Sequence, residues 1–205
     1  MTFEDKVIHW PQLIAKIIAV FNETPEPAQP KTRRLHDPPH IDQNHPWAFF
    51  DGAAQLQGFG GGFLLYKNEQ HNYKAKLGLG AGSNNFAELI TLRHLLHFAL
   101  NHDCLHLNIY GDSKIIIDWF NNITTCHTHS LSSILDEIFI LKAQFTDISC
   151  HHIYREHNNC ADQLSKEATA LPRGEWMIQE QRGDNAYQYY HRPYIDAQYH
   201  RAASP

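Results

Sequence analysis

The stretch Trp47-Ala48-Phe49-Phe50-Asp51-Gly52-Ala53-Ala54 places one acidic residue in the middle of an apolar run. Its length and aromatic content are typical of a buried β-strand, and we expect this strand to lie at the centre of a sheet. A buried carboxylate is costly unless it is paired with a positive charge or binds a cation. Because no basic residue lies nearby in the sequence, Asp51 predicts a metal ion.

The residues after this strand predict an α/β domain over residues 47–171. We expect a glycine-rich turn at Gly58–Gly62 and then two more strands, Phe63–Asn68 and Tyr73–Leu79, which complete an antiparallel meander. Helices and strands then alternate: helix 85–102, strand 105–110, helices 113–122 and 130–145, strand 147–154 and helix 161–170. This order predicts a mixed five-stranded sheet, with three antiparallel and then parallel strands, and helices on both faces.

Three outer segments flank this domain. Residues 1–22 have the apolar spacing of an amphipathic helix, which Pro11 is expected to kink. Residues 23–46 are rich in proline and predict an extended linker. Residues 172–205 form a tyrosine-rich C-terminal tail with little aliphatic support. Several alternatives stay open for the tail: it packs on its own domain or stays loose, it stacks on single-stranded bases, or it docks on a partner.

The composition of the chain excludes several classes of protein. Apolar residues make up 42% of the 205 residues, which is enough for a packed core and excludes wholesale disorder. Acidic residues exceed basic ones by 22 to 17, so any contact with nucleic acid must use a local patch. The four cysteines lie far apart, and no segment resembles a signal peptide or a membrane span. We therefore expect a cytoplasmic or nuclear protein that is not secreted.

Three further acids fall near the ends of predicted elements. Asp112 directly follows a strand, where open α/β sheets bind their ligands, and Glu88 and Asp162 lie in the first turns of two helices. Each also has a capping explanation: Asp112 is a possible N-cap, and the other two complete capping-box patterns that begin at Asn85 and Asn159. The four acids together favour a cation site, because capping does not explain the acid in the first strand.

Four short motifs carry a family resemblance, and they occur in the order that the family has. They are Phe49-Phe50-Asp51-Gly52-Ala53-Ala54, Ser83-Asn84-Asn85-Phe86-Ala87-Glu88-Leu89, Tyr110-Gly111-Asp112-Ser113 and Arg155-Glu156-His157-Asn158-Asn159-Cys160-Ala161-Asp162-Gln163-Leu164. Together they resemble the four signatures of type 1 ribonuclease H, over residues 47–171. The first and last motifs are most similar to the ribonuclease H domain of plant retroelement reverse transcriptases.

The resemblance implies a ribonuclease H-like fold and an endonuclease that hydrolyses the RNA strand of RNA–DNA hybrids. It also implies a pair of Mg²⁺ ions, for which Mn²⁺ can substitute. In these roles Asp51 bridges both ions and Asp162 helps to hold the ion that delivers the water. Glu88 and Asp112 hold the ion that faces the leaving oxygen.

The resemblance also assigns residues beside the metal site. A histidine in the loop before the last acid assists proton transfer or product release, and His157 fits that position better than His152. A solvated loop histidine is the alternative reading of His157. The residues expected to contact the hybrid are Gly52, Ala53, Ser83, Asn84 and Asn85. Helix capping is the alternative role for the two asparagines.

Two departures from the family bear on substrate binding. The turn after the first strand reads Gln55-Leu56-Gln57-Gly58-Phe59-Gly60, and residues 121–130 lack the basic protrusion of some members. We therefore expect weak and salt-dependent affinity for a hybrid. A non-catalytic nucleic-acid or protein binding module of the same fold is the alternative function, and a DNA nuclease or transposase is a third. A reverse transcriptase or another protein is the expected partner of the N-terminal helix or the tail.

Overall fold

The computed structural model describes residues 11, 14 and 36–191, and the chain divides into two units, residues 1–35 and 36–205. All the elements below belong to the second unit. Most of the predicted N-terminal helix, the linker as far as residue 35 and the tail from residue 192 lie outside the described residues. No helix in the described part of the chain is both long enough and apolar enough to cross a membrane.

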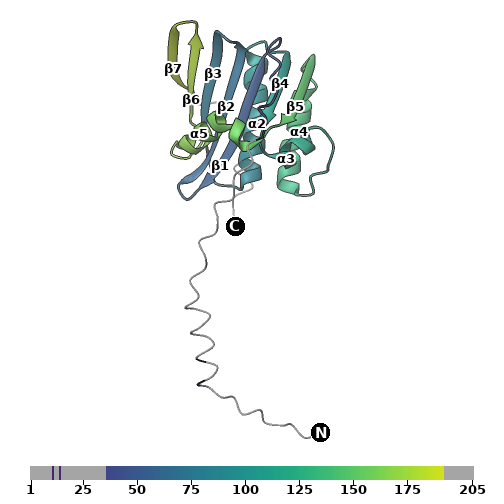
Figure 1. Ribbon diagram of the computed structural model, residues 1–205, viewed down its shortest axis with the longest axis vertical. Helices are drawn as coiled ribbons and strands as arrows, with labels where there is room; N and C mark the ends of the chain where they lie inside the picture. Colours follow the sequence, from purple (N-terminus) through teal and green to yellow (C-terminus); the bar gives the residue numbers. More distant parts are fainter. Residues whose placement is uncertain (1–10, 12–13, 15–35, 192–205) are drawn as a thin grey trace. The chain divides into compact units, whose positions relative to one another are not determined.

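A mixed sheet of seven strands forms the centre of the described unit, in the order β5-β4-β1-β2-β3-β6-β7 (Figure 1). The strands are β1 (Trp47–Gln55), β2 (Gly58–Asn68), β3 (His71–Gly80), β4 (His106–Gly111), β5 (Asp147–His152), β6 (Trp176–Arg182) and β7 (Asn185–His191). The pairs β1–β4 and β4–β5 are parallel, and the other neighbours are antiparallel. The mixed sheet was expected, but the predicted number of five strands was wrong.

The two additional strands come from the first part of the predicted tail. β6 pairs with β3, and β7 pairs with β6, so this hairpin covers an edge that β3 would otherwise leave open. Trp176 and Ile178 of β6 are buried in the main core and supply the apolar support that the tail was thought to lack. Gly183, with φ of 53°, and Asp184 connect the two strands in a two-residue turn.

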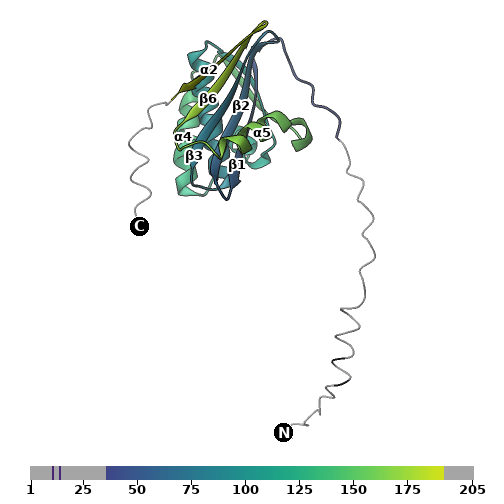
Figure 2. The same ribbon diagram turned by 90° about the vertical axis from the view of Figure 1, so that its left-hand side faces the viewer.

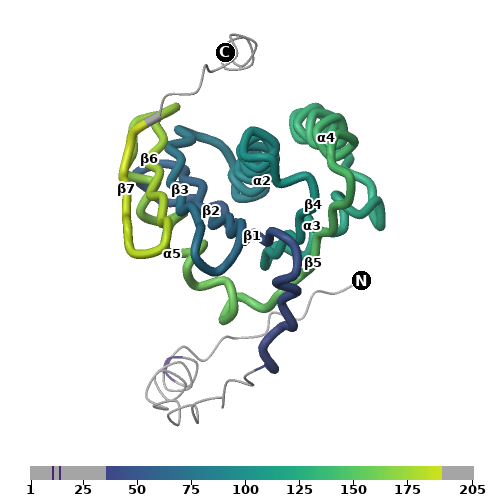
Figure 3. Tube along the Cα trace, turned by 90° about the horizontal axis from the view of Figure 1, so that it is seen from above, coloured from purple at the N-terminus to yellow at the C-terminus, as the bar shows by residue number. Residues whose placement is uncertain are grey.

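Helices cover both faces of the sheet, as expected. They are α2 (Asn84–Asn101), α3 (Lys114–Phe120), α4 (His129–Lys142) and α5 (Asn159–Ala168), with a short 3₁₀ helix η1 (Arg155–His157) before α5. α2 packs on β1 and β2 with α4 beside it, and α5 packs on the opposite face against β1, β2 and β3 (Figure 2). Seen from above in Figure 3, α2 and α4 lie on one side of the strands and α5 lies on the other.

The segment Gly58–Gly62 is the first half of β2 and not the predicted turn. A Cβ atom at Gly60 or Gly62 would collide with the main chain of α5, and one at Gly61 would collide with the side chain of Thr91 on α2. Glycine at these positions therefore lets two helices approach opposite faces of the same strand. The sequence pattern was misread because glycine serves close approach here instead of chain reversal.

Residues 36–46, which we name the strap, lie against the sheet although the sequence places them in the linker. The carbonyl of Pro46 accepts a hydrogen bond of 3.0 Å from the amide of Asn108 in β4. Ile41 packs against a small buried cluster that contains Trp47 and Tyr110. The prolines of the strap do indicate extended chain, but its apolar residue gives that chain a place to pack.

Candidate active site

The carboxylates of Asp51, Glu88 and Asp112 converge at one place. One oxygen from each lies within 4.8 Å of the other two, an arrangement that could hold a metal ion. We name these three residues the acid cluster. Asp51 lies in the middle of β1, and Asp112 follows β4. Because β1 and β4 run parallel with Phe49 opposite Tyr110, the two aspartates, each two residues further on, reach the same level of the sheet.

Glu88 reaches the cluster because α2 begins close to β1. A Cβ atom at Gly52 would collide with the main chain of α2 at Ala87 and Glu88, so only glycine lets the helix rest on the strand there. Ser83 caps α2, and its Oγ accepts a hydrogen bond of 3.2 Å from the amide of Phe86. The predicted capping box that begins at Asn85 is therefore wrong, and Glu88 is left for another role.

Asp51 and Glu88 are buried and Asp112 is half-buried, so the acid cluster brings like charges together where little water can screen them. Burial, together with the charges of Asp112 and Asp162, raises the pKa of Asp51 to about 7, although the Ser165 hydroxyl donates a hydrogen bond to its Oδ2 that acts in the opposite direction. Burial and the charge of Asp51 raise the pKa of Glu88 well above its ordinary value. Oε2 of Glu88 is buried and has no hydrogen-bond partner among the described residues. A divalent cation would satisfy this atom and neutralise the cluster, so the residues fit a metal ion.

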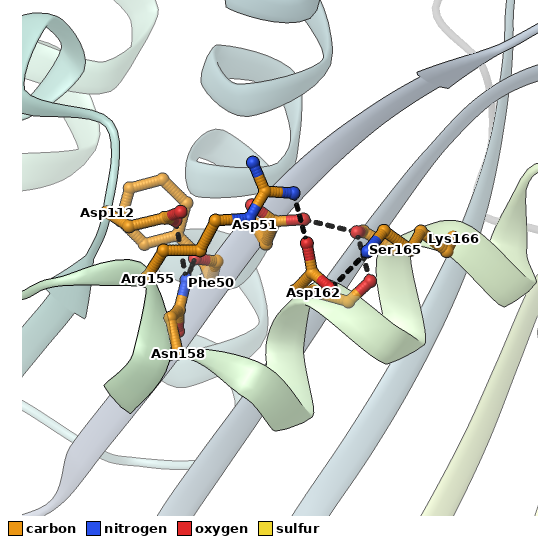
Figure 4. A network of polar contacts seen from close by, with 8 residues as sticks. All are labelled: Phe50, Asp51, Asp112, Arg155, Asn158, Asp162, Ser165 and Lys166. Carbon is orange, nitrogen blue, oxygen red and sulfur yellow. Dashed lines mark hydrogen bonds and ion pairs between the residues drawn. The ribbon is translucent and has the colours of Figure 1, made fainter. Parts of the chain in front are cut away.

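Asp162, the fourth predicted acid, lies beside the cluster but is paired with cations. It is in the first turn of α5, and its two oxygens accept hydrogen bonds of 2.5 Å from Arg155 Nη2 and Lys166 Nζ (Figure 4). Burial favours the neutral acid, but these two hydrogen bonds hold the pKa of Asp162 below its usual value. Ser165 links the two sites, because it donates to Asp51 and also contacts the carbonyl of Asp162 at 2.9 Å.

Asn158 is a site residue that has no assigned role in the sequence analysis. Its side chain is buried, and Nδ2 donates hydrogen bonds of 2.9 Å to the carbonyl of Phe50 and 2.8 Å to Oδ1 of Asp112. It therefore ties β1, the end of β4 and the loop before α5 together. Asn158 occupies the N-cap position of α5 without a side-chain cap bond, and Asn159 contacts the carbonyl of Glu156, so the capping box predicted from Asn159 is also wrong.

Asp112 does not cap α3, because Ser113 occupies the N-cap position of that helix. His157 lies in η1, between Arg155 and Asn158, and its Nε2 is 3.1 Å from the carbonyl of His36. His152, the weaker alternative, ends β5 and is exposed on that strand. Of the two histidines, His157 is the one that lies between Arg155, which binds Asp162, and Asn158, which binds Asp112.

The residues predicted to contact a hybrid gather around the start of α2 and the middle of β1. Ser83 precedes α2, and Asn84 and Asn85 are its first two residues, of which Asn84 is exposed. Gly52 and Ala53 follow Asp51 in β1, and Ala53 is buried. Their position beside the acid cluster is compatible with substrate contact, which stays a prediction.

Comparison with known proteins identifies the family. Residues 50–168 match the family model described as reverse transcriptase-like. The chain belongs to the reverse transcriptase-like family. This bears out its resemblance to type 1 ribonuclease H, a likeness that the motifs around Asp51, Glu88, Asp112 and Asp162 carry. No curated protein sequence matches this reverse transcriptase-like chain.

Solved structures with a similar fold are ribonucleases H. Ribonuclease H1 from the archaeon Halobacterium salinarum aligns with a TM-score of 0.57 at 24% identity, over 60% of this reverse transcriptase-like chain and 96% of that one. The N-terminal ribonuclease H domain of a Mycobacterium tuberculosis protein aligns with a TM-score of 0.55 at 22% identity, over 61% of this chain and 93% of that one. LC11 ribonuclease H1, solved in complex with an RNA/DNA hybrid, aligns with a TM-score of 0.53 at 24% identity, over 60% of this chain and 96% of that one. These likenesses show a ribonuclease H fold.

Proposed function

We propose that this protein is a metal-dependent endonuclease that hydrolyses the RNA strand of RNA–DNA hybrids. The observation that carries the proposal is the convergence of Asp51, Glu88 and Asp112 with an unpartnered, buried Glu88 oxygen. Membership of the reverse transcriptase-like family and a structural neighbour solved with an RNA/DNA hybrid support the same activity. An origin from a retroelement polyprotein, suggested by the similarity of the sequence motifs, is part of the proposal.

Hard carboxylate oxygens at this site suit Mg²⁺, with Mn²⁺ as a substitute. Asp51, Glu88 and Asp112 would hold one ion, and Asp51 with Asp162 would hold a second. Bound there, the ions would activate a water molecule, neutralise the phosphate charge and stabilise the leaving 3′ oxygen.

The protein residues divide the remaining work of the reaction. The hydroxyl of Ser165 and the amide of Asn158 each donate to a carboxylate, Ser165 to Asp51 and Asn158 to Asp112, and so fix the orientation of both ligands. Arg155 holds Asp162 beside them. His157 would move a proton during product departure, and its position in the loop between Arg155 and Asn158 supports this role.

Asp162 also supports a second candidate function, a nucleic-acid binding module without catalysis. Two cations, Arg155 and Lys166, already satisfy both oxygens of this carboxylate. If those pairs persist when substrate binds, only the acid cluster is left to hold metal. Such a protein would bind a hybrid without cleaving it.

A cleavage assay separates these functions. The purified chain is given labelled RNA–DNA hybrid, double-stranded RNA and double-stranded DNA, each with Mg²⁺, with Mn²⁺ and with chelator. We expect cleavage of the RNA strand in the hybrid only, and none with chelator. Binding of the hybrid without cleavage in either metal would favour the binding module, and cleavage of duplex DNA would overturn the assignment of substrate.

A further inference from the structure

His36, at the start of the strap, makes four contacts with the loop before α5. Its main-chain amide donates to Oε1 of Glu156 at 3.1 Å, and its ring Nδ1 lies 2.7 Å from the same oxygen. Its ring stacks on Tyr154, with centroids 3.4 Å apart and planes 9° from parallel. Its carbonyl lies 3.1 Å from Nε2 of His157, which donates to it. A residue 118 positions earlier in the chain, counted from His36 to Tyr154, thus holds this loop.

The loop that His36 contacts is polar and partly exposed. None of the residues of η1 is buried, so apolar packing does not set the position of Arg155, Glu156 or His157. On the opposite side the same loop contacts the active site, because Arg155 binds Asp162 and Asn158 binds Asp112. The strap and the site acids therefore both contact this one short polar loop.

The negative charge of Glu156 strengthens its hydrogen bonds with His36. Hydrogen bonds from the side chain and the main chain of His36 lower the pKa of Glu156 to about 2. Glu156 is therefore a charged acceptor throughout the neutral range, and hydrogen bonds to an ionised carboxylate are among the stronger ones. The hydrogen bond from Nε2 of His157 to the carbonyl of His36 also defines the tautomer of His157. A neutral imidazole that donates from Nε2 carries its lone pair on Nδ1.

We propose that His36 is a positioning residue that fixes the loop 154–158 and, through it, the orientation and tautomer of His157. This role rests on the proposed nuclease function, because it concerns the same site. It gives the strap a task in addition to joining residues 1–35 to the domain. Without the contacts of His36, the loop would still be joined to the site acids by Arg155 and Asn158.

The first test measures the loop without any reaction. His36→Ala removes the stack and the ring donor, and His45→Ala is the matched control. His45 lies on the same strap but stacks on His106, 5.5 Å away between centroids, and does not touch the loop in the described structure. In metal-free protein we expect amide hydrogen exchange at residues 154–158 to become at least about tenfold faster in His36→Ala and to stay unchanged in His45→Ala.

A spectroscopic measurement tests the orientation of His157. Nitrogen-15 chemical shifts should report the Nε2–H tautomer of His157 in the wild-type chain and in His45→Ala, and a mixture of tautomers in His36→Ala. A merely structural loss of stability would not select this one imidazole. Unchanged exchange and an unchanged tautomer in His36→Ala would overturn the proposal, whether or not the protein cleaves a hybrid.

A double-mutant cycle and steady-state kinetics complete the test. If His36 acts in part through Glu156, the loss of loop protection in His36→Ala combined with Glu156→Ala should be smaller than the sum of the two single losses. On a hybrid substrate we expect kcat to fall about tenfold with KM unchanged. Fully additive losses of loop protection would contradict the proposal that His36 acts through Glu156. Absence of cleavage by the wild-type chain would instead overturn the proposed function and leave the exchange and tautomer results to decide on His36.

Discussion

Asp51 is the residue on which the candidate site depends. It is 5% exposed, and its hydrogen bond from Ser165 does not neutralise its charge. A bound cation would explain its position in an inner strand, and the buried Glu88 oxygen, which has no hydrogen-bond partner among the described residues, supports the same explanation.

Replacing Asp51 by asparagine should therefore separate activity from stability. We expect Asp51→Asn to lower hybrid cleavage at least about a thousandfold, because a metal ligand is lost. In chelator the same change should raise the melting temperature by about 5 °C, because it removes repulsion within the acid cluster while the amide oxygen still accepts from Ser165. Calorimetry and the cleavage assay measure these effects.

Asp147→Asn is the matched control, since Asp147 is an exposed acid at the start of β5 and lies outside the cluster. It should leave both quantities unchanged. A metal-free Asp51→Asn protein that melts below the wild type would contradict the electrostatic explanation.

The raised pKa of Asp51 also predicts how stability depends on pH. The folded chain takes up a proton near pH 7 that the unfolded chain takes up only near pH 4, so the folded state binds more protons between these values. The contribution of Asp51 therefore makes the metal-free protein less stable as pH rises from 4 to 7. Urea unfolding at pH 5 and pH 7.5, in chelator, should show a decline that is roughly 2–4 kcal/mol smaller in Asp51→Asn. Equal declines would show that Asp51 titrates normally.

At the scale of elements, the four acids and the core strands were predictable because short motifs and local patterns carry them. β1, α2 and α5 lie close to their predicted ranges, and Asp51, Glu88 and Asp112 meet as expected. The predictions that were wrong concern segments whose structure depends on contacts with residues distant in the sequence. The glycines of β2 were taken as a turn because nothing local shows that a helix lies on each face.

Two other failures have the same cause. The strap was assigned to a linker because its contact with the loop around Glu156 spans more than a hundred residues. The hairpin β6–β7 was assigned to a tail because its strand pattern has meaning only against the open edge of β3. The Gly183-Asp184 turn between Trp176 and Tyr187 was the one local signal for it.

Close approach of α5 to β2 predicts a specific sensitivity at Gly62. In Gly62→Ala the new methyl group meets the main chain of α5 at Ser165, so the helix that carries Asp162 must move away. We expect a loss of about 1–3 kcal/mol in the free energy of unfolding, measured by urea titration, and weaker metal binding.

Gly183→Ala is the control for this change. Gly183 also has no side chain, but a Cβ atom there meets nothing within 4 Å, and only its φ of 53° opposes alanine. It should cost about 1 kcal/mol and leave metal affinity unchanged. Equal metal affinity in both variants would count against the placement of α5 as a site element.

For the whole molecule, the hairpin β6–β7 should be required for stability but not for the arrangement of the acids. A chain that ends at Glu175 loses the buried residues Trp176 and Ile178 and exposes the edge of β3. We expect its melting temperature to fall by more than about 5 °C and its tendency to self-associate to rise, by calorimetry and sedimentation. A chain that ends at residue 191 is the control. A shortened chain as stable as that control would show that the hairpin is dispensable.

The consecutive glycines of β2, Gly60 to Gly62, affect how rigidly the two helices are spaced across the sheet. Glu88 belongs to a helix on one side of the sheet, and Asp162 belongs to the helix on the other. Between these helices the sheet presents only main chain at Gly61 and Gly62, where no side chain is available to change rotamer and absorb a displacement. The distance between the two acids is thus set by the thickness of the polypeptide itself. Such a spacer is stiff, and it would hold constant the separation between the two ion sites to which Glu88 and Asp162 would contribute.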